Sequence, residues 1–257
     1  MPVTGELGNA VADTAVTRCR RGLAQQLRAD AVHASAMAGS GHPASSMSAA
    51  ELMAVLLDGH LRLGPAGTRD RHCDHLIFSR GRAWPLSYAM LKAAGTIGAE
   101  QLAGFPKTGR WPLGQSLPPT APTDVVTGLT GQGLPIGIVQ ALAGHLERLP
   151  CRVWVLCGDS EMAETSTWEA FRYAGRVALG NLTVVVDVNR LGHAGEVMLT
   201  RDLRRARAFG WHADVIDGHD VDAIDRAYRE AATDSGRPSV IFARTRTANR
   251  HQPDWRK

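Results

Sequence analysis

The second half of the chain alternates short apolar runs with segments of helical spacing, and this rhythm restricts the fold more than any other feature. Val153 to Cys157 and Leu182 to Val188 are apolar and rich in β-branched residues, so we expect both faces of these strands to be buried. Strands of this kind separated by helices indicate a parallel sheet. We therefore predict an α/β fold, an open parallel sheet with helices on both faces, with strands at 153–157, 182–188, 213–216 and 240–243 and helices at 163–178, 201–209 and 221–233.

The first half is less regular but supplies further elements of the same layers. Apolar residues at helical spacing predict a helix over 15–38 that ends at Gly39-Ser40-Gly41. Residues 104–123 are rich in glycine and proline and predict a long loop, which inside a compact domain usually has a function. We also expect a helix at 47–61, a strand at 76–79, a helix after Pro85, a flexible N-terminus over 1–14, one domain over 15–245 and an arginine-rich tail over 246–257.

Composition excludes several classes of protein. With 257 residues, 44% of them hydrophobic, the chain has ample material for one large domain. A formal charge of +4 is too small to indicate a nucleic-acid partner, and no apolar run approaches the roughly 18 residues of a membrane span. The N-terminus lacks a basic region followed by an apolar run, and the four cysteines form no CxxC pair. We expect a cytoplasmic protein that acts on small molecules, with no nucleic acid and no membrane.

Two polar residues follow the two most apolar strands. Asp159 comes just after the first strand and Asn189 just after the second, one strand-helix-strand crossover further on. Because parallel strands end at the same edge of a sheet, these side chains can share one crevice. A carboxylate and an amide oxygen suit Mg²⁺, which commonly completes its shell with phosphate oxygens. The alternative is that Asp159 caps the following helix and Asn189 is a turn residue.

The segments around these residues resemble the thiamine-diphosphate signature of transketolases. Gly158 to Glu164 (GDSEMAE), Trp168-Glu169-Ala170 and Asp187-Val188-Asn189 match it in order and spacing. Together the matches span about residues 15 to 245, so the chain is identified as a member of the transketolase family. Further matches are Ser40-Gly41-His42-Pro43 to SGHPG, 74–79 to DxFVLS, 127–133 (TGLTGQG) to TGPLGQG, 209–211 to FGW and 217–220 to DGHD.

The resemblance implies a cofactor site at the diphosphate end. Asp159, Asn189 and the backbone carbonyl of Leu191 would hold Mg²⁺, which in turn would hold the diphosphate of thiamine diphosphate. Gly158 and Ser160 would lie against that diphosphate.

The resemblance also implies roles around the reacting end of the cofactor. Gly128 and Thr130 would line the aminopyrimidine through backbone groups. Glu164 matches the glutamate that communicates between paired active sites, and His42 matches a histidine that faces the substrate. The implied activity is transfer of a two-carbon ketol unit from a ketose to an acceptor. Decarboxylation of a 2-oxo acid by a related enzyme, or a non-catalytic scaffold, are the alternatives.

Departures from the family pattern point to an unusual substrate. Ser160 replaces the glycine at the third position of GDG. The family's SNGH is Ser79-Arg80-Gly81-Arg82, so a histidine is replaced by Arg82. A second histidine aligns with Gly114, and His251 lacks the motif of a third. Arginine offers a fork of donors that can grip a phosphate or carboxylate but cannot shuttle protons. We therefore expect a specialised biosynthetic reaction.

The resemblance covers one of the domain types of a transketolase. The glutamate that contacts the cofactor's pyrimidine belongs to the other domain type in this family. We therefore expect a separate C-terminal subunit to complete the site, in an α₂β₂ heterotetramer, because paired sites and Glu164 require two copies of each.

Three other patterns allow different interpretations. We do not expect a metal at His72, Cys73 and His75, since these side chains would alternate faces and no fourth ligand is evident. The arginines within 201–207 would spread around a helix, as on a solvated face or a subunit contact. Gly131-Gln132-Gly133 precedes an apolar helix but lacks the GxGxxG of a dinucleotide loop.

Overall fold

A six-stranded parallel sheet forms the centre of the molecule. The structure is a computed structural model that describes residues 4–38, 43–64, 72–104, 124–189, 196–233 and 236–246. The strand order is β2-β1-β3-β4-β6-β5, and every neighbouring pair is parallel. This confirms the predicted fold class. The strands are β1 (His75–Phe78), β2 (Val125–Val126), β3 (Val153–Gly158), β4 (Leu182–Val188), β5 (His212–Asp217) and β6 (Ser239–Arg244).

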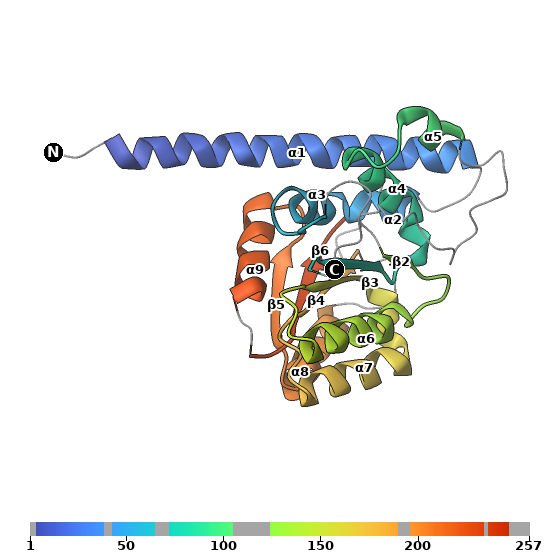
Figure 1. The fold of residues 1–257 in the computed structure, drawn as a ribbon, viewed down its shortest axis with the longest axis vertical. Coiled ribbons are helices and arrows are strands. Elements are labelled where there is room, and N and C mark those ends of the chain that lie inside the picture. The colour runs from blue at the N-terminus through green and yellow to red at the C-terminus, as the bar shows by residue number, and fades with distance from the viewer. Residues whose placement is uncertain are drawn as a thin grey trace, which may run out of the picture.

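Helices cover both faces of the sheet. On one face lie α2, α3, α4 and α9, with the long α1 across them, and on the other lie α6, α7 and α8 (Figure 1). The helices are α1 (Thr4–Ala38), α2 (Pro43–Ser48), α3 (Ala50–Gly59), α4 (Trp84–Ala93), α5 (Ala99–Gly104), α6 (Gly133–Leu146), α7 (Thr165–Arg176), α8 (Glu196–Ala208) and α9 (Val221–Thr233), with 3₁₀ turns η1 (Gly81–Ala83) and η2 (Asp159–Ala163).

The central strands are mostly apolar because each strand contributes to two cores. Side chains alternate across a strand, so Trp154 packs in the core below α1, α3 and α9, and Val155 packs in the core below α6 and α7. The first core places Trp154 5.1 Å from Tyr228 between ring centroids. The second places Phe171 4.4 Å from Trp211. Both faces of β3 and β4 are therefore buried, which explains why their sequences are apolar apart from Thr183 and Asp187 in β4.

The register of β3 and β4 positions the residues that follow them. Val153 pairs with Leu182, and the ladder continues to Gly158 opposite Asp187. Beyond this pair, Asp159 and Asn189 are the first residues after each strand. On the other side of β3, Phe78 pairs with Leu156, so β1 ends at the same edge. The carboxyl ends of three adjacent strands therefore meet at one edge of the sheet.

Several predicted boundaries need correction. The strand at 182–188 and the helix at 221–233 have the predicted bounds, but α1 begins at Thr4 and not at Ala15. A formed helix extends at little cost per residue, even across Gly5 and Gly8. The predicted helix at 47–61 is two helices, because Ala49 has a backbone conformation (φ −96°, ψ 8°) outside the helical region. Gly104, the first residue of the predicted loop at 104–123, ends α5. The rest of that loop and the residues from 247 onward lie outside the described residues.

Helix α1 is the longest element and extends past α9 at its N-terminal end (Figure 1). At 1.5 Å per residue its 35 residues span about 50 Å. Within the described ranges no helix is apolar and long enough to cross a membrane. Cys19 lies exposed on this helix, whereas Cys157 in β3 is fully buried.

Candidate functional site

A fully buried carboxylate lies at the carboxyl edge of the sheet. Asp187, near the end of β4, has an exposed fraction of 0%. Ser48 Oγ donates to its Oδ2 at 2.6 Å, and Thr245 and Arg80 donate to its two oxygens as well. These donors come from α2, from the residue after β6 and from the residues after β1. Asp187 therefore joins four segments at this edge.

Asp159 and Asn189 flank this carboxylate and are themselves buried, with exposed fractions of 6% and 3%. Asp159 Oδ1 accepts the backbone N–H of Ser160 at 2.8 Å. The amide nitrogen of Asn189 donates to Ser48 Oγ at 3.3 Å and lies 3.4 Å from Asp187 Oδ2. Its oxygen, and not its nitrogen, would therefore be the cation ligand. The alternative that Asp159 caps the following helix is not what the structure shows, because no side chain caps α7.

Arg80 supplies positive charge among these carboxylates. Its guanidinium pairs with Asp187, and Nη2 donates to Ser45 Oγ at 3.3 Å. The Arg80 side chain also lies 3.4 Å from the position that a Cβ on Gly158 would occupy. Burial lowers the pKa of Arg80, while Asp159 and Glu161 act in the opposite direction. The charge is therefore held next to the GDS turn at the end of β3.

Glu161 connects the turn after β3 to two other segments. It is 1% exposed, and its Oε2 accepts the N–H of Gly158 at 2.7 Å. Its Oε1 accepts the N–H of Gly131 at 3.0 Å and the hydroxyl of Ser79. Burial raises the pKa of Glu161, although these hydrogen bonds and Arg80 act against the rise. One side chain thus fixes the relative positions of the turn after β3, the end of β1 and the loop before α6.

Glycines allow the loop over residues 127–133 to pack closely on its surroundings. Gly131 has φ +75°, which a residue with a side chain rarely adopts. A Cβ on Gly133 would lie 2.2 Å from Ser79 Cβ, and one on Gly81 would lie 2.0 Å from the carbonyl oxygen of Thr127. The loop is therefore tightly held at both ends, while Gly128 and Thr130 between them are exposed.

Glu164 contacts this loop from the start of α7. Thr130 Oγ1 donates to Glu164 Oε1 at 3.0 Å, and Ser166 Oγ donates to the carbonyl of Gly131 at 3.0 Å. Arg82 lies exposed in η1, next to Gly81, which packs against Thr127 at the start of the same loop. Gly128, Thr130, Glu164 and Arg82 therefore lie around one loop.

The DGHD segment (217–220) forms hydrogen bonds that stabilise the same edge of the sheet. Nε2 of His219 accepts the backbone N–H of Arg246 at 2.8 Å, which leaves Nδ1 to donate to Glu51 Oε2 at 3.1 Å. A hollow of about 320 Å³ opens beside it, at the ends of β5 and β6. Thr245 lines this hollow and also donates to Asp187. The hollow therefore adjoins the buried carboxylate cluster.

The structure brings most of the predicted site residues to one edge of the sheet. Gly158 ends β3, Asp159 and Ser160 follow it, and Asn189 follows β4. Glu161 connects this turn to the loop that carries Gly128 and Thr130. The described part of the chain contains no group of three His, Cys, Asp or Glu side chains placed to hold a metal. The predicted set has one carboxylate, one amide and one backbone carbonyl. Four predicted or discussed residues, His42, Gly114, Leu191 and His251, lie outside the described residues.

Sequence reasoning missed the residues that hold this edge together. Glu161 and Asp187 lie inside the GDSEMAE and DVN segments, and Arg80 lies inside the SRGR segment, yet none was singled out as part of the site. Their only signal in the sequence is a charged residue near the end of an otherwise apolar strand, in the case of Asp187, or two to three residues after one, in the cases of Arg80 and Glu161. Which of these charges are buried together depends on the strand order, which the sequence does not display.

Comparison with known proteins identifies the family. Residues 19–250 match the family described as "Transketolase, thiamine diphosphate binding domain". The chain belongs to the transketolase family. It is 37% identical to human transketolase over 227 residues, which is 86% of this chain and 36% of the human protein. The chain thus spans about a third of the length of the whole transketolases that it matches.

A shorter relative matches over most of its own length. The chain is 32% identical over 212 residues to the 6-deoxy-6-sulfo-D-fructose transketolase subunit SqwG of Clostridium sp. (strain MSTE9), covering 80% of this chain and 77% of that subunit. Among solved structures, transketolase from Campylobacter jejuni superposes with a TM-score of 0.77 at 27% identity, over 89% of this chain and 38% of that one. These matches confirm the recognition made from the motifs and the thiamine-diphosphate-binding fold.

Proposed function

We propose that the chain is the diphosphate-binding part of a transketolase-like transferase that depends on thiamine diphosphate and Mg²⁺. The enzyme would take a two-carbon ketol unit from a ketose or a similar donor and pass it to an acceptor. The observation that carries the proposal is the pairing of Gly158 with Asp187, which leaves Asp159 and Asn189 buried at neighbouring strand ends. The family match to a thiamine diphosphate binding domain supports it.

The residues at the carboxyl edge fit the proposed metal and diphosphate. Asp159 and Asn189 offer a carboxylate and an amide oxygen, the hard ligands that Mg²⁺ prefers, and the carbonyl of Leu191 would be the third protein ligand. Gly158 and Ser160 would lie against the diphosphate, where Arg80 adds positive charge. When bound, the cofactor would supply the electron sink for C–C bond cleavage, and the protein would supply orientation and electrostatics.

The loop before α6 is the proposed seat of the aminopyrimidine. Gly128 and Thr130 would line it through backbone groups. The hydrogen bond from Thr130 to Glu164 then links this loop to the residue proposed to communicate with a paired site. Because Glu161 fixes Gly131 to Gly158, the proposed pyrimidine and diphosphate contacts are held at a constant separation.

Substrate contacts are proposed for His42 and Arg82. An exposed Arg82 beside the loop can grip a phosphate, sulfonate or carboxylate group of the substrate. A histidine at this position is the family pattern, so the change supports a specialised biosynthetic reaction over turnover of common sugar phosphates. The relative from Clostridium carries 6-deoxy-6-sulfo-D-fructose in its name, an example of an acidic donor that is not a phosphate.

A separate C-terminal subunit is the proposed partner, in an α₂β₂ heterotetramer. The match to a transketolase subunit over 77% of its length supports a two-chain enzyme. Residues 15–245 would form the domain, with 1–14 and 246–257 as flanking segments. We propose that the protein acts in the reducing cytoplasm, since its four cysteines form no CxxC pair. Coexpression with a chain that resembles the second half of transketolase, followed by measurement of mass, tests this assembly. A 27.6 kDa monomer that turns over substrate unaided would contradict it.

Calorimetry of cofactor binding tests the central proposal. The complex of both chains should bind thiamine diphosphate only when Mg²⁺ is present. Asp159→Ala should weaken binding at least 100-fold, because it removes the one charged ligand from the proposed metal site. Glu230→Ala is the matched control, since this exposed carboxylate lies on α9, away from the carboxyl edge. Unchanged affinity in Asp159→Ala would contradict the metal assignment.

Product analysis separates the proposed reaction from its alternatives. Two-carbon transfer conserves carbon between donor and acceptor, whereas a 2-oxo acid decarboxylase releases CO₂. We expect transfer without CO₂, and slow turnover of xylulose 5-phosphate with ribose 5-phosphate. CO₂ release from a 2-oxo acid would favour the decarboxylase. Cofactor binding without turnover of any ketose donor would favour the scaffold.

A further inference from the structure

We propose that the chain has a second anion site, a cleft between α1 and α9 that binds a polyphosphate such as the triphosphate of a nucleotide. The cleft has a volume of about 1070 Å³ and is defined here as the arginine cleft by Arg18, Arg20, Arg21, Arg226 and Arg229. It is separate from the proposed cofactor site, and the inference does not depend on the proposed function.

The cleft carries excess positive charge. Five arginines line it against two aspartates, Asp222 and Asp225. Its one histidine, His60, does not add to this charge at neutral pH, because burial lowers its pKa. The lining thus has a formal charge of +3, which a small polyanion can neutralise.

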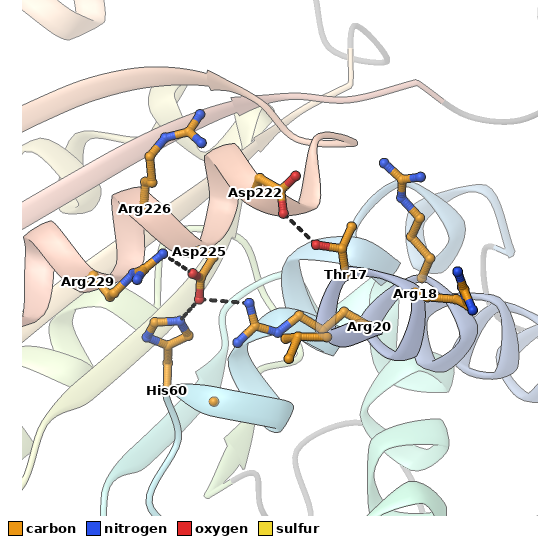
Figure 2. A pocket seen from close by; sticks show the side chains of 11 residues that line it. Thr17, Arg18, Arg20, His60, Asp222, Asp225, Arg226 and Arg229 are labelled. Atoms are coloured by element: carbon orange, nitrogen blue, oxygen red, sulfur yellow. Dashed lines mark hydrogen bonds and ion pairs between the residues drawn. The ribbon is translucent and has the colours of Figure 1, made fainter. Parts of the chain in front are cut away.

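The two aspartates are engaged with neighbouring side chains, and their charges are already included in the total of +3. One carboxylate oxygen of Asp225 lies 2.8 Å from Arg20 Nη1 and 2.7 Å from His60 Nε2. The other oxygen pairs with Arg229. Asp222 accepts a hydrogen bond from the hydroxyl of Thr17 at 2.7 Å, which joins α9 to α1 in the lining of the cleft. Figure 2 shows this network around Asp225, with Arg18 and Arg226 pointing away from it.

Three arginines remain for a ligand. Arg18, Arg21 and Arg226 are exposed, and none forms an ion pair with a carboxylate in the part of the chain that the structure describes. Arg18 and Arg21 are three residues apart on α1, so they share a face of that helix. Arg226 lies on α9 and lines the same cleft. A guanidinium presents a planar fork of donors that matches phosphate oxygens.

The shape of the cleft favours a small polyphosphate over a macromolecule. The donors come from two helices that a hydrogen bond joins, and they line one hollow. Its volume of about 1070 Å³ lies just above the range for small-molecule sites, about 300–1,000 Å³. A chain of phosphates offers more oxygen acceptors to arginines on two helices than a single phosphate does.

The Gly59 end of the cleft is about one helix length from the carboxylate cluster at the carboxyl edge of the sheet. Helix α3 begins two residues after Ser48, which contacts Asp187, and ends at Gly59, which lines the cleft. Its ten residues rise about 15 Å, at 1.5 Å per residue. One ligand therefore cannot fill both sites, and α3 connects them.

Calorimetric titration with tripolyphosphate tests the site, using the full chain in metal-free buffer. We expect saturable binding to one site. The double variant Arg18→Ala/Arg21→Ala and the single variant Arg226→Ala should each bind at least tenfold more weakly. The matched control is Arg176→Ala/Arg204→Ala, which removes the same charge from exposed positions on α7 and α8. The control should stay within twofold of the unmodified chain.

Further binding measurements distinguish this site from the proposed cofactor site, and a polyphosphate ligand from a macromolecular one. Asp159→Ala should bind tripolyphosphate as the unmodified chain does, even if it no longer binds cofactor. Absence of binding, or equal loss in the control variant, would overturn the proposal. Tighter binding of a polyglutamate peptide or a short DNA duplex than of tripolyphosphate would also overturn it, because the cleft would then be a macromolecular contact. Circular dichroism of each variant checks that it is folded.

Discussion

Charged side chains gather in two regions of this chain, at the carboxyl edge of the sheet and in the arginine cleft. At the edge, Asp187, Glu161 and Asp159 are buried with Arg80, and each charge has neighbours of opposite sign or backbone donors. In the cleft the charges sit on helix surfaces, and several face solvent. Burial makes a charge depend on its partners, because an unpaired charge in the interior is far costlier than one in water. The first region should therefore affect folding and binding together, and the second should affect binding alone.

Removal of Arg80 should lower the free energy of unfolding more than any other change proposed for these two regions. Arg80→Met keeps much of the side-chain volume but leaves Asp187, Asp159 and Glu161 without their cation. We expect the free energy of unfolding to fall by about 3–5 kcal/mol, the usual cost of removing one partner of a buried ion pair. Urea denaturation measures it. Arg204→Met, on an exposed face of α8, should cost less than about 0.5 kcal/mol.

Glu161→Gln should have the next largest effect. The two glutamate oxygens accept N–H groups from Gly158 and Gly131, and an amide has only one oxygen. A buried N–H would then face an NH₂ group, at a cost of about 3 kcal/mol. Glutamine should also weaken thiamine diphosphate binding, since the turn and the loop lose their common anchor. Wild-type stability in this variant would contradict the role of Glu161.

The same variant should change the pH dependence of stability. In the folded chain the pKa of Glu161 is raised above its ordinary value of 4.5. Between these two values the folded state binds more protons than the unfolded state, so stability falls as pH rises through this window. Glu161→Gln has no carboxyl group to titrate, so its free energy of unfolding should not fall in this pH range. The loss of stability caused by the substitution should therefore be largest below pH 4.5 and should become smaller as pH rises through the raised pKa of Glu161. Denaturation at a series of pH values measures the difference.

Two glycine substitutions, one at the carboxyl edge and one on α1 beside the arginine cleft, should have smaller and opposite effects on stability. Gly133→Ala would place a Cβ 2.2 Å from Ser79 Cβ, so the loop before α6 must shift, at a cost of about 2 kcal/mol. Gly22→Ala on α1 has no heavy atom within 4 Å of its Cβ and should stabilise the chain by about 0.5–1 kcal/mol. Thermal denaturation of both variants should therefore shift in opposite directions. Shifts of the same sign would contradict the packing described for the loop.

The smallest effect on stability is expected in the arginine cleft. Arg18→Ala/Arg21→Ala should change the free energy of unfolding by less than about 0.5 kcal/mol, because both side chains are exposed and bear no ion pair in the described structure. The same double variant should lose tripolyphosphate binding. A large loss of stability would show that these arginines have structural partners.

The sequence predicted the strands well because burial on both faces leaves an unbroken apolar signal. β4 and α9 have their predicted bounds, and β3 and β6 begin or end within one residue of prediction. Elements without such a signal were missed. β2 has two residues, and α5 has six, too few to show a period.

The site was predicted as a set of motif residues but not as a network. Asp159 and Asn189 were found because each follows an apolar strand, and the pairing of β3 with β4 places them as neighbours. Glu161, Asp187 and Arg80 owe their role to contacts between segments far apart in the chain, such as Arg80 with Asp187, 107 positions apart, and Ser48 with Asp187, 139 positions apart. No local pattern encodes such pairing, because it depends on the order of strands in the sheet. The arginine cleft was missed for the same reason, since its donors come from helices at opposite ends of the chain.

The buried thiol of Cys157 can be used to measure how often the end of β3 opens. This thiol lies one residue before Gly158, is fully buried, and burial raises its pKa well above the usual value. Only a thiolate that reagents can reach is alkylated or forms mixed disulfides, so Cys19 on the surface of α1 should react at once and Cys157 only when β3 opens. Mass spectrometry of the labelled peptide would read how often the end of this strand separates from its neighbours. An anion that holds the turn after β3 in place would slow that labelling, without any need for a substrate or an assay of turnover.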